Sequence, residues 1–266
     1  MARKLTKPSA TSSPTATTST TSHPTAAAAA ATTTPGLPRI LTDAKPLPRL
    51  VVFDLDYTLW PFWVDTHVSP PLRAQQAAPQ TSAALDRTGE SFAFYDDIPL
   101  TLHALSRAGV RLGVASRTHA PDLARDMLKL LYVPPASAVL PPAHEAVLLP
   151  DRSAGAGGGN SSSSSGSGSG SGSSSSKKDG KPRRALDFFD GGMEIYPGSK
   201  IRHMESLQKR NGGAGVAFAD ILFFDDESRN RDVETLGVTM WLVRDGVSWD
   251  EVEKGIREWR RRRGVV

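Results

Sequence analysis

Short apolar segments alternate with amphipathic segments over two parts of the chain, residues 47–150 and 183–266. The apolar segments predict buried strands at residues 50–53, 111–115, 186–189, 221–224 and 238–243. The amphipathic segments carry apolar side chains at helical spacing and predict helices at residues 99–107, 121–131, 199–209, 230–236 and 249–260. Strands that alternate with helices favour parallel pairing with right-handed crossovers. The predicted fold class is therefore α/β, with a doubly wound, Rossmann-like parallel sheet.

Two other parts of the chain lack this pattern and consist mainly of small or polar residues. Residues 1–46 are mostly Ser, Thr, Ala and Pro, and residues 151–182 are rich in Ser and Gly and end in Lys and Arg. Such segments bury too little apolar surface to offset their chain entropy. We therefore expect a disordered tail at 1–46 and one folded domain at 47–266, which a disordered insert interrupts at 151–182.

Composition narrows the chemistry that this domain can perform. The chain has no cysteine, which excludes disulfides, thiolate zinc sites and cysteine nucleophiles. No apolar run reaches the length of a membrane span, and the N-terminus lacks the apolar core of a secretory signal. The net charge of +4 is modest, and no element that reads nucleic acid accompanies the basic residues. We expect a monomer without a nucleic-acid or membrane partner, in the cytoplasm or nucleus rather than in mitochondria.

Polar side chains follow three of the predicted strands or open the helix near them. They are Asp54 and Asp56 after the first strand, Ser116 after the second, Asp225 and Asp226 after the strand at 221–224, and Lys200 at a helix start. In doubly wound sheets, ligands bind beyond the carboxyl ends of the strands. We therefore expect these side chains to converge on one edge of the sheet.

The chemistry of these groups points to a metal and a phosphate. Neighbouring carboxylates repel one another, and a bound divalent cation removes that conflict. Oxygen ligands of this kind select Mg²⁺, so the candidate ligands are Asp54, Asp56, and Asp225 or Asp226. The hydroxyl of Ser116, the backbone N–H groups of the turn that follows it, and Lys200 can hold a phosphate. Phosphoryl transfer needs little more than positioning and charge neutralisation, and a carboxylate can be its nucleophile.

The same residues resemble the four motifs of the haloacid dehalogenase (HAD) superfamily: Asp54-x-Asp56-x-Thr58-Leu59, Ser116, Lys200 and Asp225-Asp226. Longer matches at 53–61, 115–118, 196–200 and 224–227 resemble the eukaryotic magnesium-dependent phosphatase-1 family. The resemblance covers roughly residues 47–140 and 185–256, with the same motif order. It implies a HAD-like fold without a large cap domain, because Ser/Gly repeats at 151–182 cannot form one.

The resemblance also implies a role for each matching residue. Asp54 is expected to attack phosphorus, and Asp56 to protonate the leaving oxygen, activate the second-step water and bind Mg²⁺ through its backbone carbonyl. Ser116 and Lys200 are expected to hold the phosphoryl group. Asp225 and Asp226 are expected to serve the metal, with Thr58 and Asn230 in support. Family members accept phosphotyrosine and phosphorylated sugar adducts, so a phosphorylated small molecule or a phosphoprotein is the expected substrate.

Two further residues are candidates for substrate contact at the site mouth. Trp60, Phe62 and Trp63 cannot all face the core, so we expect Trp63 to reach the mouth and receive a flat leaving group. Arg117 follows Ser116 directly and is a second candidate.

Two alternatives share this fold: a catalytically silent module that binds phosphorylated ligands, and a dehalogenase. Asp56 argues against the dehalogenase, because displacement of halide needs no acid for a leaving oxygen.

Overall fold

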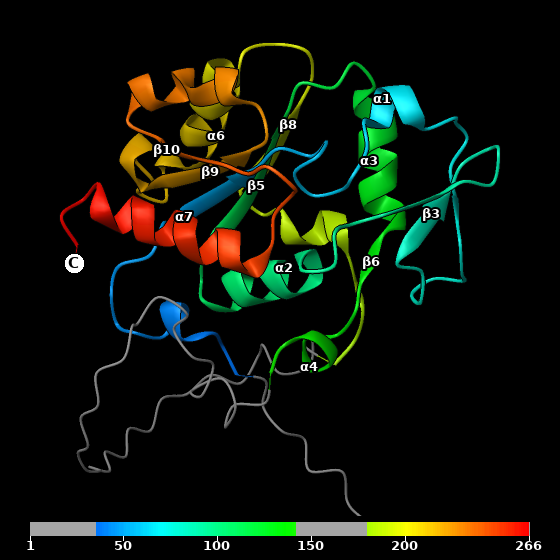
Figure 1. Ribbon diagram of the computed structural model, residues 1–266, viewed down its shortest axis with the longest axis horizontal. Coiled ribbons are helices and arrows are strands. Elements are labelled where there is room, and N and C mark those ends of the chain that lie inside the picture. Colours follow the sequence, from blue (N-terminus) through cyan, green and yellow to red (C-terminus); the bar gives the residue numbers. More distant parts are fainter. Residues whose placement is uncertain (1–35, 142–179, 266) are drawn as a thin grey trace, which may run out of the picture. The chain divides into compact units, whose positions relative to one another are not determined.

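The computed structural model describes residues 36–141 and 180–265 of the chain (Figure 1). The predicted tail at 1–46 and insert at 151–182 lie outside the described residues, except for 36–46 and 180–182. A central sheet of five parallel strands has the order β10-β9-β1-β5-β8. Its strands are β1 (Leu50–Phe53), β5 (Arg111–Ser116), β8 (Gly192–Ile195), β9 (Ile221–Asp225) and β10 (Thr239–Leu242). The predicted doubly wound α/β fold is confirmed.

Helices cover both faces of this sheet. On one face lie α2 (Ile98–Arg107) and α7 (Trp249–Arg261), which contact each other (Figure 1), and α3 (Pro121–Leu130) shares their apolar cluster. On the other lie α6 (Lys200–Gly212) and the 3-10 helix η4 (Ser228–Leu236).

Alternate residues of β1 separate the two apolar layers. Val51 and Phe53 belong to the cluster beneath α2 and α7, whereas Leu50 and Val52 belong to the cluster that contains Met204 of α6. This alternation follows from the two-residue repeat of a strand, and burial on both faces explains why β1 is continuously apolar.

One predicted strand is wrong. Residues 186–189 lie mostly in the 3-10 helix η2 (Ala185–Phe188), and the edge strand is β8, which begins at Gly192. A Cβ on Gly191 would lie 2.7 Å from the carbonyl oxygen of Leu112, so glycine lets the backbone approach β5 closely. The apolar residues 186–189 therefore form a helical turn that buries Phe188 in the core. β8 itself is short and half-polar, so its sequence does not show the apolar run of a buried strand.

A small antiparallel sheet between β1 and α2 was not predicted. After α1 (Val64–His67), it consists of β2 (Arg73–Ala74), β3 (Ala83–Leu85) and β4 (Ser91–Ala93). The buried carboxylate of Asp86 orders the β3–β4 turn by accepting the backbone N–H groups of Thr88 and Glu90. The strands are too short to show an alternating pattern. Further short elements are β6 (Tyr132–Val133), β7 (Arg183–Arg184), α4 (Ala136–Val139) and η3 (Phe218–Asp220).

The predicted boundary of the N-terminal tail is also wrong for residues 36–46. This segment contains the 3-10 helix η1 (Arg39–Leu41), in which Ile40 and Leu41 are buried. Asp43 accepts hydrogen bonds from the guanidinium of Arg260 on α7 at 2.6 and 2.9 Å. Few apolar residues suffice here because a long-range ion pair completes the contact. Among the residues that the structure describes, no helix has the length and apolar character that crossing a membrane requires.

Candidate active site

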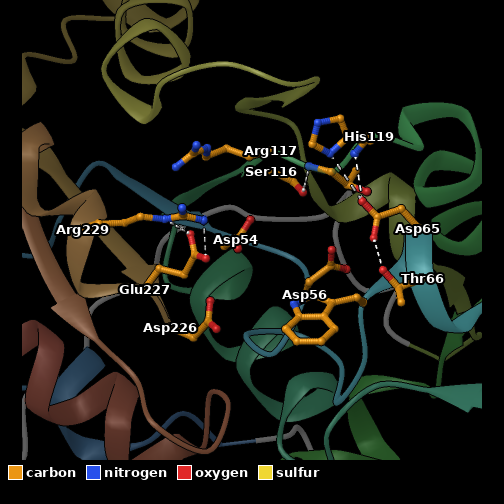
Figure 2. Close-up of a pocket in the computed structure, with 12 residues that line it drawn as sticks. Asp54, Asp56, Asp65, Thr66, Ser116, Arg117, His119, Asp226, Glu227 and Arg229 are labelled. Carbon is orange, nitrogen blue, oxygen red and sulfur yellow. Dashed lines mark hydrogen bonds and ion pairs between the residues drawn. The ribbon is translucent and has the colours of Figure 1, made fainter.

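A pocket of about 420 Å³ opens at the carboxyl ends of β1, β5 and β9 (Figure 2). Parallel strands place their carboxyl ends at one edge, which is why distant segments meet there. Its lining combines carboxylates, hydroxyls and cations with one aromatic ring: Asp54, Asp56, Trp63, Asp65, Thr66, Ser116, Arg117, Thr118, His119, Asp226, Glu227 and Arg229.

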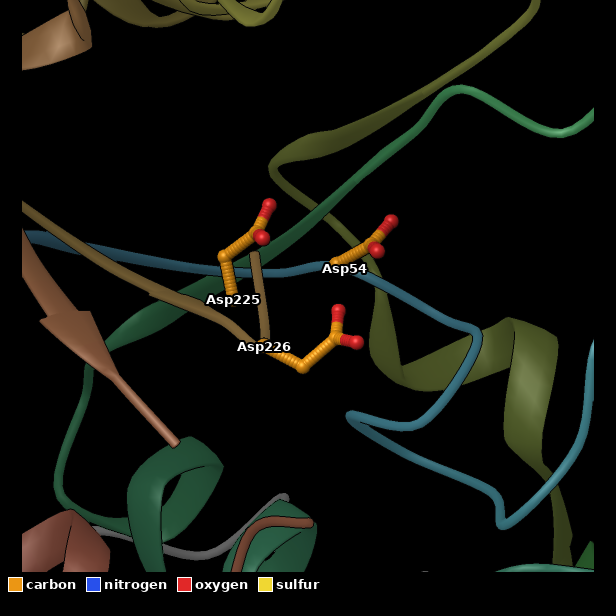
Figure 3. Close-up of side chains that lie close together, drawn as sticks. All are labelled: Asp54, Asp225 and Asp226. Carbon is orange, nitrogen blue, oxygen red and sulfur yellow. The ribbon is translucent and has the colours of Figure 1, made fainter. Parts of the chain in front are cut away.

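Three carboxylates meet at the base of the site (Figure 3). Asp54, Asp225 and Asp226 each offer an oxygen, and these oxygens lie within 4.8 Å of one another. The three come from the ends of two adjacent strands, β1 and β9. An all-oxygen donor set of this kind fits Mg²⁺.

The two acids after β9 have different surroundings. Asp225 is fully buried, and its two carboxylate oxygens both accept from Nδ2 of Asn230 at 2.9 Å. The backbone N–H of Glu227 also donates to Asp225 at 2.7 Å. Asp226 is only partly buried and lines the pocket. Asn230 thus supports this loop by fixing Asp225, while Asp226 presents its carboxylate to the pocket.

Lys200 lies between two of the carboxylates. Its Nζ is 2.8 Å from Oδ1 of Asp54 and 3.0 Å from Oδ2 of Asp225, and it also donates to the carbonyl oxygen of Ala115. Burial favours the neutral amine, but the two carboxylates outweigh it and raise the pKa of Lys200 above its ordinary value. The lysine is therefore a fixed positive charge beside the nucleophile candidate.

The carboxylates themselves are crowded and poorly solvated. Burial raises the pKa of Asp54 to about 7, although Lys200 opposes this rise. Burial, together with the charges of Asp225 and Glu227, raises the pKa of Asp226 to about 6. A divalent cation at this position would relieve the repulsion and favour the ionised forms.

Asp56 lines the same pocket, but it lies in a turn and not in a strand. The strand does not continue past Phe53; the chain turns, and Tyr57 has a φ of 51°. Oδ1 of Asp56 accepts from Nε1 of Trp60 at 2.7 Å and from the backbone N–H of Val64 at 3.1 Å. Burial raises the pKa of Asp56 to about 6, and these donors moderate the rise. Its side chain is therefore held apart from the three-carboxylate group.

The turn after β5 faces these acids. Ser116 is buried, and its Oγ accepts from the backbone N–H of Thr118 at 3.4 Å. Arg117 donates to Oδ1 of Asn230 at 3.2 Å, so it links the turn after β5 to the segment that follows Asp225 and Asp226. The N-cap residue of α3 is Ala120, and Oγ1 of Thr118 accepts from the backbone N–H of Ala120 at 3.2 Å.

The aromatic residues after the first motif divide as expected. Trp60 and Phe62 are buried and stacked, with centroids 5.3 Å apart. Trp63 is 50% exposed at the pocket, and Tyr57 supports it edge-on at 5.1 Å. Thr58 is buried beneath the site, where its carbonyl accepts from Val247 N at 3.0 Å.

Several pocket residues were not among the sequence candidates: Asp65, Thr66, Thr118, His119, Glu227 and Arg229. Each lies within or shortly after a segment that we matched to the motifs, which is the only signal that the sequence offers for them. Glu227 and Arg229 form an ion pair with Nε to Oε2 at 2.9 Å. The positive charge of Arg229 is thus largely neutralised by Glu227 at the rim of the pocket.

Comparisons with known proteins agree on one family. The family model described as Acid Phosphatase matches residues 46–262. A HAD-like hydrolase superfamily protein of Schizosaccharomyces pombe is 35% identical over 192 residues, which are 72% of this chain and 83% of that protein. Magnesium-dependent phosphatase 1 of Homo sapiens is 32% identical over 211 residues, 79% of this chain and 86% of that protein. A relative in Saccharomyces cerevisiae is 31% identical over 207 residues, 76% of this chain and 92% of that protein.

Proposed function

Because the chain belongs to the acid phosphatase family of HAD-like hydrolases, we propose that it is a Mg²⁺-dependent phosphomonoester hydrolase whose nucleophile is Asp54. The resemblance to the HAD superfamily and to its magnesium-dependent phosphatases is confirmed by the family match and by the relatives. The activity is that of a phosphatase with Mg²⁺ as its cofactor. The aspartyl-phosphate route and the substrate class are our proposal.

One observation supports the mechanism above all others. The carboxylate of Asp54 lies in an open pocket beside Asp225 and Asp226, and the ammonium of Lys200 is 2.8 Å from it. The lysine orients the buried carboxylate of Asp54, and the two neighbouring acids can bind a cation. Such a carboxylate is suited to attack a phosphoryl group whose charge the cation neutralises. Asp54, Asp226 and the backbone carbonyl of Asp56 would hold the Mg²⁺, with Asp225 oriented behind them. The ion supplies charge neutralisation for the phosphoryl oxygens.

The reaction proceeds in two displacements. A carboxylate oxygen of Asp54 forms a bond to phosphorus while the ester P–O bond breaks, and Asp56 gives its proton to the leaving oxygen. Asp56 then accepts a proton from water as the water oxygen bonds to phosphorus and the Asp54–phosphorus bond breaks. A pKa of about 6 leaves Asp56 able to act in both directions near neutral pH.

The turn after β5 and Lys200 hold the transferred group. The Ser116 hydroxyl donates to a phosphoryl oxygen, and the Lys200 ammonium offsets negative charge on the same group. Lys200 is already positioned by three acceptors, so little reorganisation accompanies the reaction.

An open mouth and the exposed Trp63 favour an aromatic phosphate, as in phosphotyrosine, or a phosphorylated sugar or glycation adduct. The pocket admits either a small molecule or a protein-borne phosphate. If Trp63 stacks on the leaving group, Trp63→Ala lowers kcat/KM about 10-fold for aryl phosphates and less for sugar phosphates. Steady-state kinetics on both classes decide this, and an equal loss for both contradicts the stacking role.

The decisive test is hydrolysis of p-nitrophenyl phosphate with Mg²⁺ or with EDTA. We expect Mg²⁺-dependent release, which Asp54→Asn abolishes without loss of the folded state. Asp250→Asn is the control, because Asp250 pairs with Lys254 on the exposed side of α7. Turnover by Asp54→Asn would overturn the nucleophile assignment. Binding of phosphate without any turnover by the wild type would instead identify a silent phospho-ligand module.

A further inference from the structure

The turn that carries Ser116 has little support of its own. Between the end of β5 and the start of α3 at Pro121, its internal hydrogen bonds are Thr118 N to Ser116 Oγ at 3.4 Å and Ala120 N to Thr118 Oγ1 at 3.2 Å. Ala120 at the N-cap position has no side-chain acceptor for the helix N–H groups. A turn with only two such internal contacts depends on contacts with other elements, and the bonds from Arg117 to Asn230 and from Tyr196 N to Ser116 O are two of these.

Asp65 on α1 supplies a further contact, on the side of the first motif (Figure 2). Its Oδ2 accepts the backbone N–H of His119 at 3.1 Å, and the hydroxyl of Thr118 also donates to this carboxylate. A third donor, Thr66 Oγ1, lies 3.0 Å from Oδ1 and holds the carboxylate from its own helix. Hydrogen bonds to an ionised acceptor are the stronger ones, so one carboxylate joins the first-motif segment to the turn.

The environment of Asp65 suits this role. Its side chain is 25% exposed and lines the pocket, whereas the His119 ring is 82% exposed and contributes little to burying it. Although burial opposes ionisation, the donors from His119, Thr66 and Thr118 lower the pKa of Asp65 below its ordinary value. The carboxylate is thus ionised when it holds the turn.

We propose that Asp65 is a positioning residue that fixes the phosphate-binding turn at 116–120 against the segment that carries Asp54 and Asp56. The inference rests on the proposed function in one respect, which is that Ser116 binds the phosphoryl group. Asp65 acts through His119 N and the Thr118 hydroxyl and does not touch the reacting atoms.

The direction in which phosphate affinity changes when Asp65 is replaced separates this positioning role from a purely electrostatic one. Asp65 is a negative charge at an anion site, so its removal would tighten phosphate binding if charge alone mattered. Loss of positioning has the opposite effect, because the turn N–H groups and Ser116 would no longer converge on one point.

The experiment measures the Ki of inorganic phosphate against p-nitrophenyl phosphate, with Mg²⁺ and the full chain. We expect Asp65→Asn, which keeps one acceptor for His119 N, to raise the Ki about 3-fold, and Asp65→Ala about 10-fold. Asp126→Asn is the control, since Asp126 is exposed on α3 and pairs with Lys129. A Ki that is unchanged or lower in Asp65→Asn overturns the proposal, and this variant decides the matter even if Asp65→Ala does not fold.

A second measurement distinguishes positioning from general stability. In a Ser116→Ala background, Asp65→Asn should change the Ki much less than it does in the wild type, because both act on the same contact. Fully additive effects would contradict the inference. A wild type that lacks phosphatase activity would instead overturn the proposed function, and binding of inorganic phosphate by calorimetry would then still test Asp65.

Discussion

At the residue scale, the site contains buried charges of opposite sign that stabilise one another. Lys200 is almost fully buried and contacts two carboxylates, Asp54 and Asp225. Removal of one partner from such a group leaves buried charge uncompensated, which is more costly than the pair is worth. If Mg²⁺ binds at the proposed site, the ion and Lys200 would share the neutralisation of these acids.

This sharing predicts the behaviour of Lys200→Met. In EDTA we expect the variant to lose ~3 kcal/mol of unfolding free energy, because Asp54 and Asp225 lose their cation. With saturating Mg²⁺ the loss should be smaller, since the ion takes over part of the neutralisation. Urea unfolding in both conditions measures the difference. Lys254→Met, at an exposed pair on α7, should leave the unfolding free energy nearly unchanged in both conditions. An equal loss with and without Mg²⁺ would contradict this account.

His203 is a buried histidine whose pKa is lowered, in contrast to the raised pKa values of Asp54 and Asp226. Its Nε2 donates to the carbonyl of Tyr196 at 3.1 Å, and burial, with Lys200 nearby, lowers the pKa of His203 to about 4. The unfolded chain has the higher pKa, near 6.5, so this stability is present above about pH 6.5 and is lost as the pH falls toward 4.

A substitution at His203 isolates its share of acid sensitivity. Between pH 7 and 4.5 the wild type should lose ~2 kcal/mol more unfolding free energy than His203→Gln. Glutamine keeps a donor for Tyr196 but does not titrate. Denaturant unfolding at the two pH values measures this difference, and parallel losses in both proteins would show that His203 does not titrate as described.

The sequence indicated the site residues that belong to strand-end motifs but not those that act through tertiary contacts. Asp54 and Ser116 lie at the ends of strands with a clear apolar pattern, and Lys200 opens a helix with a clear pattern, so their convergence could be predicted. The surroundings of Asp56 could not, because they depend on the left-handed turn at Tyr57 and on a bond to Trp60. The contact of Asp65 could not be predicted either, because its partner is a backbone N–H that lies 54 residues away in the sequence.

At the element scale, long helices and central strands were predictable and short edge elements were not. The central strands are apolar on both faces, which gives an unbroken hydrophobic run. β8 lies at the sheet edge, with Met193 and Glu194 half-buried, and its pattern does not differ from that of a loop. The local signal at this edge is the glycine pair Gly191-Gly192, where the chain enters β8 and approaches β5 closely.

The close approach at this edge predicts the effect of Gly191→Ala. The new Cβ would lie 2.6 Å from Leu50 Cδ1 and 2.7 Å from the Leu112 carbonyl oxygen, which belongs to backbone that cannot rotate away. We expect a loss of ~2 kcal/mol of unfolding free energy. Gly213→Ala is the matched control, because its Cβ would meet nothing within 4 Å. Thermal unfolding of both variants tests this, and equal melting temperatures would contradict the close packing.

At the scale of the whole described region, segments far apart in sequence complete both the site and the core. Parallel pairing of β1 with β9 brings Asp54 beside Asp225 and Asp226, although β9 begins only at Ile221. Fold-level rules predict this contact, because they concern strand ends in general. No such rule predicts the segment at 36–46, whose attachment depends on one arginine in a distant helix.

That arginine gives the last prediction. Arg260 donates to both oxygens of Asp43 and to the carbonyl oxygens of Ile40, Lys45 and Pro46, so one guanidinium binds five acceptors before β1. Asp43→Asn keeps the shape but removes the charge, and we expect a loss of ~1–2 kcal/mol at pH 7.

The pH dependence of this loss follows from the titration of Asp43. Although burial opposes ionisation, Arg260 lowers the pKa of Asp43 below its ordinary 3.8. The stabilisation is therefore fully present above about pH 4 and is lost as the pH falls through the lowered folded pKa. Unfolding free energies of the wild type and Asp43→Asn should converge once the pH has fallen below this lowered pKa. A difference that persists there would show that shape, and not the charge of Asp43, holds the segment to α7.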